Sequence, residues 1–156
     1  MMSTLTIRLA NEADLPFIRS LSPTLAAKAG LSWHTDDVVQ KFQDDYIDAM
    51  MADTDVPNAT YVAARGDELL GFVHVRGRED EVSGEAGATM PLLAVKEGAQ
   101  GLGVGQALMA AAEDWTKAQG WRLLHLEVFW NNAQGRHFYE KQGYEAETIN
   151  LIKAIG

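Results

Sequence analysis

The segment PLLAVKEGAQGLGVGQALMAAAEDWTKAQ, residues 91–119, decides the fold of this chain. Its apolar residues 92–95 predict a buried strand, and its glycines predict a loop over residues 100–105. From about Val104 to Gln119, apolar residues recur at helical spacing and predict a core-facing helix. A glycine loop that opens a helix brings free backbone N–H groups and the positive end of the helix dipole to one point. The stretch therefore predicts a binding site for a phosphate or pyrophosphate.

Two widespread phosphate loops do not match these residues. A P-loop ends in Gly-Lys-Ser/Thr, whereas Gly105 is followed by Gln106 and Ala107. A dinucleotide fingerprint, G-x-G-x-x-G, counted from Gly101 would need a glycine where Gln106 stands. The pattern that fits is Gln/Arg-x-x-Gly-x-Gly/Ala, which the chain contains as Gln100-Gly101-Leu102-Gly103-Val104-Gly105. With this loop the chain resembles the GNAT superfamily of acyl-coenzyme A N-acyltransferases, in which the loop holds the pyrophosphate of coenzyme A.

A second segment strengthens the resemblance. It begins with a predicted strand at 126–129, continues through Asn131-Asn132-Ala133 at a helix start, and ends with Phe138-Tyr139-Glu140-Lys141 and Gly143-Tyr144. Both signatures occur in the family's order, and together they cover residues 88–144. The resemblance implies that acetyl-CoA is the co-substrate. It also implies that the strands before the two signatures splay apart, with the pantetheine arm in the gap between them.

The resemblance further implies roles for individual residues. Tyr139 would be the general acid that protonates the departing thiolate, because a phenol placed beside the sulfur can donate a proton; alternatively, it is a core tyrosine. A backbone N–H near Val95 would stabilise the oxyanion. Asn132 would bind the pantetheine or pyrophosphate arm, or simply cap its helix. The residues implied to bind acetyl-CoA are Leu93, Ala94, Val95, Gln100, Gly101, Leu102, Gly103, Val104, Gly105, Gln106, Asn132 and Tyr139.

The general base is where the chain departs from the family pattern. Many members carry a glutamate six residues before the position of Val95, where this chain has Thr89. An ammonium group with a pKa near 10 must still lose a proton before it attacks a thioester. The remaining candidates for the base, acting directly or through water, are Glu85, His74 and Glu127. As alternatives, His74 is a hydrogen-bonded residue of the sheet and Glu85 is a solvated loop residue.

The whole chain predicts a single domain over residues 1–156, with a mixed α+β fold built on one mixed sheet of about six to seven strands and about four helices. Hairpins in the first half predict antiparallel pairing, and helices between strands in the second half allow parallel pairing. Pro91 predicts a bulge or an unpaired edge, because proline cannot donate to a ladder. Pro23 predicts that the first helix ends or kinks there. The predicted strands are 5–9, 60–64, 69–75, 88–95, 122–129 and 144–155.

Composition restricts the partners. The chain has 22 acidic and 13 basic residues, a net charge of −9, which argues against nucleic acids and anionic membranes. This charge favours a cationic small molecule or a basic peptide as partner; alternatively, the chain is simply an acidic soluble protein. It has no cysteine, so direct acetyl transfer is favoured over an acyl-enzyme, and its histidines lack metal-ligand spacing, so no metal is predicted. With no apolar run of membrane-spanning length and no signal-peptide pattern, a cytoplasmic location is the default expectation.

The acceptor site is predicted where the first two helices meet the loop 77–87. Aromatic side chains could enclose an amine there and acidic ones could attract it; core packing and a solvated loop are the alternatives. These side chains are Trp33, His34, Tyr46, Glu79, Asp80, Glu81 and Glu85. Two other functions stay open: a non-catalytic acyl-CoA binding module, which Thr89 in place of glutamate keeps in play, and a protein N-acetyltransferase. The family resemblance also allows a homodimer.

Overall fold

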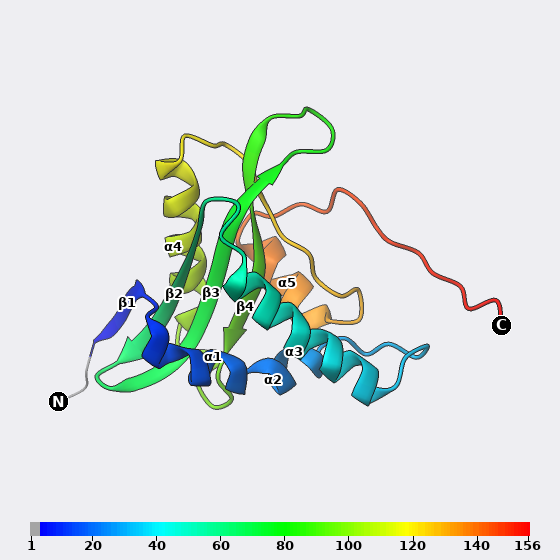
Figure 1. The fold of residues 1–156 in the computed structure, drawn as a ribbon, viewed down its shortest axis with the longest axis horizontal. Coiled ribbons are helices and arrows are strands. Elements are labelled where there is room, and N and C mark those ends of the chain that lie inside the picture. Colours follow the sequence, from blue (N-terminus) through cyan, green and yellow to red (C-terminus); the bar gives the residue numbers. More distant parts are fainter. Residues whose placement is uncertain (1–3) are drawn as a thin grey trace.

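A computed structural model describes residues 4–156 and shows one open five-stranded sheet with helices on both of its faces (Figure 1). Neighbouring strands pair antiparallel except for the last two, which are parallel. In their order across the sheet, the strands are β1 (Leu5–Leu9), β2 (Asn58–Arg65), β3 (Glu68–Glu79), β4 (Ala86–Val95) and β5 (Leu124–His125). The mixed α+β architecture predicted from the sequence is confirmed.

The helices form two layers around this sheet. Three of them cover one face: α1 (Leu15–Ser20), preceded by a 3-10 turn η1 (Glu12–Asp14), α2 (Ser22–Ala26) and α3 (Asp36–Ala52). The other two, α4 (Val104–Ala118) and α5 (Ala133–Lys141), pack toward the opposite face. Pro23 lies in the first turn of α2, so the predicted break in the first helix is confirmed. Within residues 4–156, none of these helices has the length and apolar character needed to cross a membrane.

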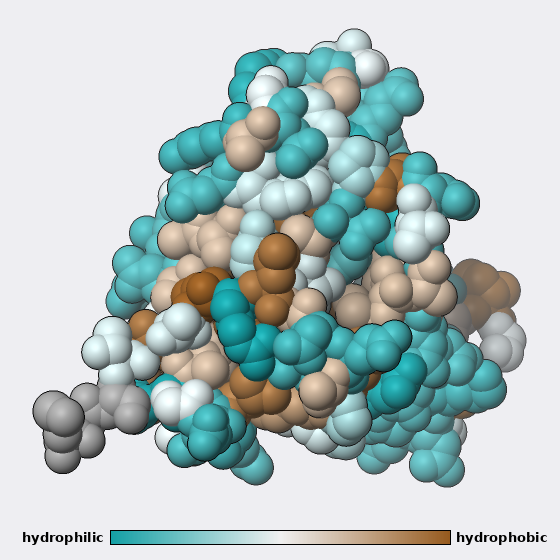
Figure 2. Space-filling view, turned by 60° about the vertical axis from the view of Figure 1, so that its left-hand side comes forward, coloured by the Kyte–Doolittle hydropathy of each residue, from teal (hydrophilic) through white to brown (hydrophobic). Residues whose placement is uncertain are grey.

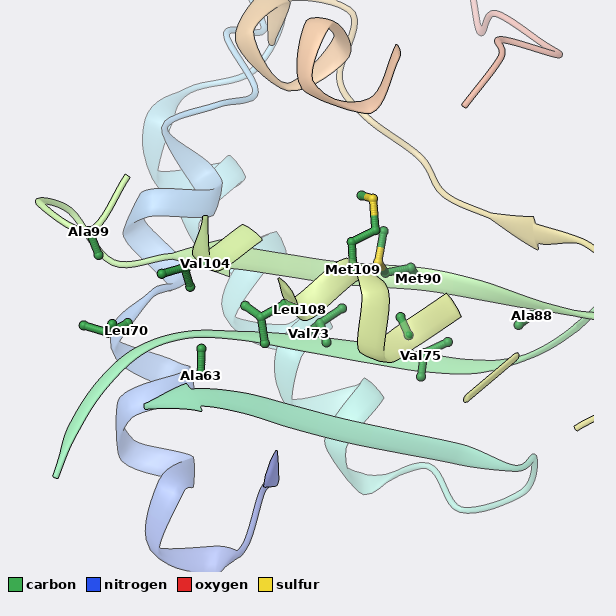
Figure 3. Close-up of a cluster of buried hydrophobic side chains, with 11 residues drawn as sticks. Ala63, Leu70, Val73, Val75, Ala88, Met90, Ala99, Val104, Leu108 and Met109 are labelled. Carbon is green, nitrogen blue, oxygen red and sulfur yellow. The ribbon is translucent and has the colours of Figure 1, made fainter. Parts of the chain in front are cut away.

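Two apolar clusters join the layers. On one face, α4 buries an i, i+4, i+8 stripe against β3 (Figure 3). The stripe and its partners are Val104, Leu108, Ala112, Val73 and Val75. On the other face, Ile18 of α1 and Ile47 of α3 pack on Phe72 of β3. Successive residues of β3 therefore serve opposite layers, as the alternation of side chains along a strand requires.

A β-bulge at Pro91 changes which side chains of β4 face α4. Between the pairs His74–Leu92 and Arg76–Thr89, β4 has one residue more than β3. Pro91 lies in this extra step, which confirms the predicted bulge. Even-numbered residues of β4 consequently pack toward α4 before the bulge and toward α1–α3 after it. The bulge therefore determines which side chains at the end of β4, just before the glycine loop, face α4.

The predictions for the last two strands are wrong. The predicted strand 122–129 is reduced to two residues, which pair with β4. The predicted strand 144–155 does not form; this segment runs away from the body (red in Figure 1), and Leu151 and Ile155 are 89% and 85% exposed. Its apolar alternation is typical of a strand, but a strand also needs a hydrogen-bonded neighbour. Among residues 4–156 this segment pairs with no strand, so the sheet has five strands rather than six to seven.

Candidate active site

The glycine loop leaves the N-terminus of α4 open. Gly103 is the N-cap residue, with a left-handed φ of 79°, and no side chain caps the helix. The first backbone N–H groups of α4 have no partner inside the helix. An added Cβ at Gly101 or Gly103 would meet no heavy atom within 4 Å. Free donors, the positive helix end and open space therefore coincide, which is suitable geometry for a pyrophosphate.

Gln100 holds the loop in this shape. Its Oε1 accepts the Gly98 N–H at 2.9 Å, and its Nε2 donates to the Val95 carbonyl at 3.4 Å. Ala99 is buried beneath it, whereas Leu102 is 48% exposed. The loop is therefore anchored to the protein at Ala99 and Gln100 and is exposed to solvent at Leu102.

The edge of β4 that leads into the loop is unpaired on one side, because β4 and β5 part after two residue pairs. Lys96 N–H donates to the Leu70 carbonyl of β3 at 2.8 Å. Backbone polar groups of an antiparallel strand point alternately to its two sides. The backbone N–H and C=O of Ala94 therefore bond to β3, whereas the backbone groups of Leu93 and Val95 point into the gap between β4 and β5. The splayed strands that the family resemblance implies are present.

Helix α5 brings Tyr139 to the α4 side of this gap. Asn132 caps α5 by accepting the Gly135 N–H at 2.9 Å. Phe138 lies 3.4 Å from a Cβ added at Gly105, so α5 packs against the first turn of α4. The rings of Phe138 and Tyr139 meet edge to face, with their centroids 5.5 Å apart. Asn132 is thus a helix cap through its oxygen, and the packing of α5 fixes the position of Tyr139.

The Tyr139 hydroxyl is a neutral donor. Burial raises the pKa of this phenol to about 12, so it stays protonated through the neutral range. The neighbouring Tyr144 donates to Glu113 at 3.0 Å, whereas the Tyr139 hydroxyl makes no hydrogen bond to any of residues 4–156. An uncommitted phenol at the edge of the gap can donate to a ligand.

The three predicted bases lie in different surroundings. His74 is 1% exposed and shares a hydrogen bond with a β2 hydroxyl, and burial lowers its pKa to about 4, so it is neutral at pH 7. Glu85 contacts Arg122 at 2.6 Å, and this contact lowers the pKa of the carboxyl group. Glu127 is 88% exposed and lies 3.7 Å from Arg78. His74 is therefore enclosed and Glu85 is engaged in an ion pair, while the carboxylate of Glu127 stays accessible.

A sequence profile of the acetyltransferase (GNAT) family matches residues 24–144. The chain belongs to this family. A curated relative, the aminoglycoside N(6')-acetyltransferase type 1 of Stenotrophomonas maltophilia, is 31% identical over 149 residues, which are 90% of this chain and 92% of the relative. The solved structure of a putative acetyl transferase from Pyrococcus furiosus is 25% identical, with a TM-score of 0.80 over 97% of this chain and 100% of that one. An aminoglycoside N-acetyltransferase solved with CoA has a TM-score of 0.70 at 20% identity, over 99% of this chain and 97% of its own.

As a GNAT protein, the chain is an acetyl-CoA-dependent N-acetyltransferase, which confirms the expectation drawn from its two signatures. The residues present fit this co-substrate. The open N–H groups at Gly103 suit the pyrophosphate, and the unpaired backbone of Leu93 and the free N–H of Val95 suit the thioester end of the pantetheine arm. No group of three His, Cys, Asp or Glu side chains within residues 4–156 is arranged to hold a metal ion.

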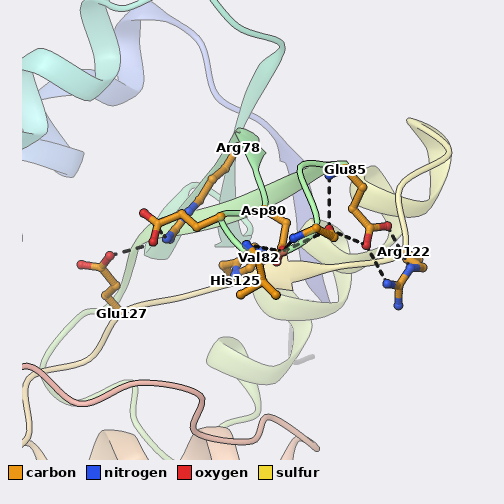
Figure 4. A network of polar contacts seen from close by, with 9 residues as sticks. Arg78, Asp80, Val82, Glu85, Arg122, His125 and Glu127 are labelled. Atoms are coloured by element: carbon orange, nitrogen blue, oxygen red, sulfur yellow. Dashed lines mark hydrogen bonds and ion pairs between the residues drawn. The ribbon is translucent and has the colours of Figure 1, made fainter.

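A polar network that the sequence did not reveal joins the end of the β3–β4 hairpin to the segment around β5 (Figure 4). The hairpin between β3 and β4 and the segment around β5 supply its residues. They are Arg78, Asp80, Glu85, Arg122, His125 and Glu127. One signal was available: Leu124 and Leu126 pack toward α4, so the strand alternation places His125 and Glu127 on the other face.

The predicted acceptor aromatics border the site from the α3 side. Tyr46 is half-buried and stacks on Phe42 at 5.6 Å; burial, and after it the charge of Glu127, raise the pKa of Tyr46. Trp33 is 42% exposed and His34 is also exposed, in the loop that precedes α3. Asn131 Nδ2 donates to the Gly30 carbonyl at 2.6 Å and ties this loop to the start of α5. Tyr46 therefore lies near the polar network, and the Trp33 loop is joined to the helix that carries the phenol.

Proposed function

We propose that this enzyme acetylates a primary amine on a cationic small molecule of the aminoglycoside class. The observation that carries the acceptor class is the 31% identity, over 90% of the chain, to a protein named as an aminoglycoside N(6')-acetyltransferase. An aminoglycoside presents several ammonium groups on one rigid scaffold. Such an acceptor gains most from a site of negative potential.

The charge near the polar network supports a cationic acceptor. The hairpin and the segment around β5 carry five carboxylates and two guanidinium groups: Glu79, Asp80, Glu81, Glu85 and Glu127, with Arg78 and Arg122. The neighbouring helix α3 contains five aspartates and one lysine; two of these aspartates, Asp45 and Asp48, form ion pairs with Lys41 and Arg19. Figure 2, a view of one side of the molecule, also shows hydrophilic residues over most of the surface, with hydrophobic ones gathered in its lower middle. The excess of negative charge attracts polyamines and repels anionic competitors.

On the co-substrate side, backbone groups do most of the binding in this proposal. The first-turn N–H groups of α4 hold the pyrophosphate, and the backbone of Leu93 bonds the amides of the arm. The Val95 N–H donates to the thioester oxygen and stabilises the negative charge that develops there during attack. Asn132 keeps its Nδ2 for the arm, since its oxygen is committed to the helix cap.

Tyr139 assists departure of the sulfur. The amine nitrogen forms a bond to the carbonyl carbon, and the carbon–sulfur bond then breaks with its electron pair on sulfur. The Tyr139 hydroxyl donates to that sulfur as its charge develops. With a pKa of about 12, this phenol is a weaker acid than a thiol, whose pKa is about 8.5, so its main contribution is a hydrogen bond to the thiolate.

The experiment that tests the proposal has two steps. Isothermal titration with acetyl-CoA should give micromolar binding that Gly103→Glu abolishes. Release of CoA is then followed with neamine, kanamycin, spermidine and a lysine-bearing peptide as acceptors. We expect release with the two aminoglycosides. Release with the peptide alone would overturn the acceptor class in favour of protein acetylation, and binding without release to any amine would favour a non-catalytic acyl-CoA module.

Two further expectations are part of the proposal. We place the enzyme in the cytoplasm, and we infer that it forms a homodimer. The exposed apolar side chains of Ile149, Leu151 and Ile155 support self-association, because large exposed apolar patches are rare on stable monomers. Nucleic acids and membranes are not expected as partners of a chain with a net charge of −9.

A further inference from the structure

A buried carboxylate and an imidazole meet at the point where β4 and β5 part. His125 is the last residue of β5 and pairs with Thr89 of β4. Its Nε2 lies 3.3 Å from Asp80 Oδ2, and the two side chains are 17% and 7% exposed (Figure 4). Neither residue was among the candidate bases predicted from the sequence. Thr89, beside His125, occupies the position where many GNAT proteins carry a glutamate.

The hairpin loop fixes Asp80 and keeps it charged. Its Oδ1 accepts three hydrogen bonds, from Val82 N–H at 3.0 Å, Ser83 N–H at 2.8 Å and Ser83 Oγ at 3.0 Å. These hydrogen bonds, the one from the Ser83 backbone first among them, hold the pKa of Asp80 below its ordinary value. Oδ2 makes none of these bonds and is left facing His125.

The two nitrogens of His125 differ in their surroundings. Nε2 is fully buried beside Asp80 and makes no aligned hydrogen bond. Nδ1 makes no hydrogen bond within residues 4–156 and, unlike Nε2, keeps some solvent-exposed surface. A carboxylate favours a proton on the nearer ring nitrogen, which leaves the lone pair of the other nitrogen free. With its proton on Nε2, beside Asp80, His125 would present an acceptor lone pair at Nδ1.

His125 and Tyr139 lie on opposite faces of the sheet at this gap. Leu124, Leu126 and Tyr139 pack toward α4, so strand alternation directs His125 to the other face. That face also carries Glu127 and the acidic hairpin that favours a cationic acceptor. An amine that approaches from this side meets the carbonyl carbon from the face away from the phenol.

We propose that Asp80 and His125 form the proton-accepting site for the acceptor ammonium, in place of a glutamate at position 89. This inference rests on the proposed function. His125 Nδ1 takes one proton from the ammonium group and passes it to water, and the nitrogen lone pair then forms the C–N bond. The C–S bond breaks with its electron pair on sulfur, and the second ammonium proton, lost as the amide forms, balances the proton that the thiolate takes up. Asp80 is a positioning residue that stabilises the imidazolium.

Other charged groups face this pair as well. Arg78 lies between Glu81 at 3.9 Å and Glu127 at 3.7 Å, and Arg122 is paired with Glu85. Both guanidinium groups are therefore opposed by carboxylates, and their effect on an imidazolium at His125 is reduced. The long contact between His125 and Asp80 is compatible with catalysis, because such hydrogen bonds often tighten only when substrate is bound.

The test is the pH dependence of kcat/KM for neamine in wild type and His125→Gln. Near pH 7 we expect a loss of about 100-fold in the variant. The loss should shrink about tenfold for each pH unit toward pH 9, because the variant depends on acceptor that is already neutral. His137→Gln, on the exposed surface of α5, is the matched control and should retain wild-type kinetics. Titration with acetyl-CoA should give the same Kd for all three proteins.

Asp80→Asn is the second variant, since its amide oxygen can keep the hairpin hydrogen bonds while the charge is removed. We expect a loss of about tenfold near pH 7 that also shrinks as pH rises. A pH-independent loss in both variants, or wild-type activity of His125→Gln, would overturn the proposal. If the wild-type enzyme acetylates no amine at all, the proposed function fails instead, so the two failures are distinguishable.

Discussion

Replacing Gly103 by alanine separates backbone strain from ligand contact at the glycine loop. Gly103 has a φ of 79°, and an added Cβ meets no heavy atom within 4 Å. Strain is therefore the only cost to folding, about 1 kcal/mol for an alanine in the left-handed region. In a domain of this size, such a loss lowers Tm by roughly 2–4 °C. The same Cβ would stand in front of the open helix N-terminus, where the pyrophosphate is proposed to bind.

Gly120 provides the matched control at the other end of α4. Its φ is 83°, and an added Cβ there also meets nothing within 4 Å. Thermal melting should show similar losses of Tm for Gly103→Ala and Gly120→Ala. Isothermal titration should show that Gly103→Ala alone binds acetyl-CoA more weakly, by about tenfold or ~1.4 kcal/mol. Equal affinities in the two variants would refute the placement of the pyrophosphate, and very different Tm losses would refute the strain argument.

Three other predictions follow from single features. Tyr139→Phe should lower kcat by roughly 10- to 1000-fold in the CoA-release assay, because the hydrogen bond to the sulfur is lost. The Kd for acetyl-CoA should not change. An unchanged kcat would contradict this role for Tyr139. His74 is held neutral with a pKa of about 4, so its contribution to stability is complete above pH ~6.5 and is lost as pH falls toward 4. Thermal melts of His74→Gln should therefore decline less over that range than those of wild type, and parallel declines would contradict it. Removal of residues 145–156 should convert a dimer to a monomer in sedimentation equilibrium without lowering acetyl-CoA affinity, and a dimer that survives the deletion would exclude this segment as the interface.

Local sequence patterns were enough to predict the features that residues of a single segment determine. The stripe from Val104 through Leu108 to Ala112 predicts α4, and its burial is confirmed. The missing N–H of Pro91 predicts the bulge, and the register of β3 and β4 confirms it. In each case the signal and its consequence lie within a few residues of one another, so no knowledge of the tertiary structure was needed.

The errors lie where pairing between distant segments decides the outcome. Residues 144–155 alternate as a strand does, yet alternation describes only the faces of a segment and not whether a neighbour is available. The same limit applies to His125, because its partner Asp80 lies 45 residues earlier and reaches it only when the β3–β4 hairpin folds back. Gln100 and Asn132 were predicted to bind acetyl-CoA, and that stays a prediction; the structure shows that Gln100 also bonds the Val95 carbonyl and that Asn132 also caps α5, which the motif alone does not reveal.

The pairing across the sheet explains how the base can move from one strand to the next without moving the site. Arg76, Thr89 and His125 form one row across β3, β4 and β5. Side chains in one row point to the same face of the sheet and are spaced about 5 Å apart. A glutamate at position 89 and a histidine at position 125 would therefore reach nearly the same region above the sheet. A glutamate would also lie beside Arg76, whose own partner is Asp53. With threonine in the middle of the row, Arg76 stays paired with Asp53, and the proton-accepting role passes to the imidazole that Asp80 orients from the hairpin.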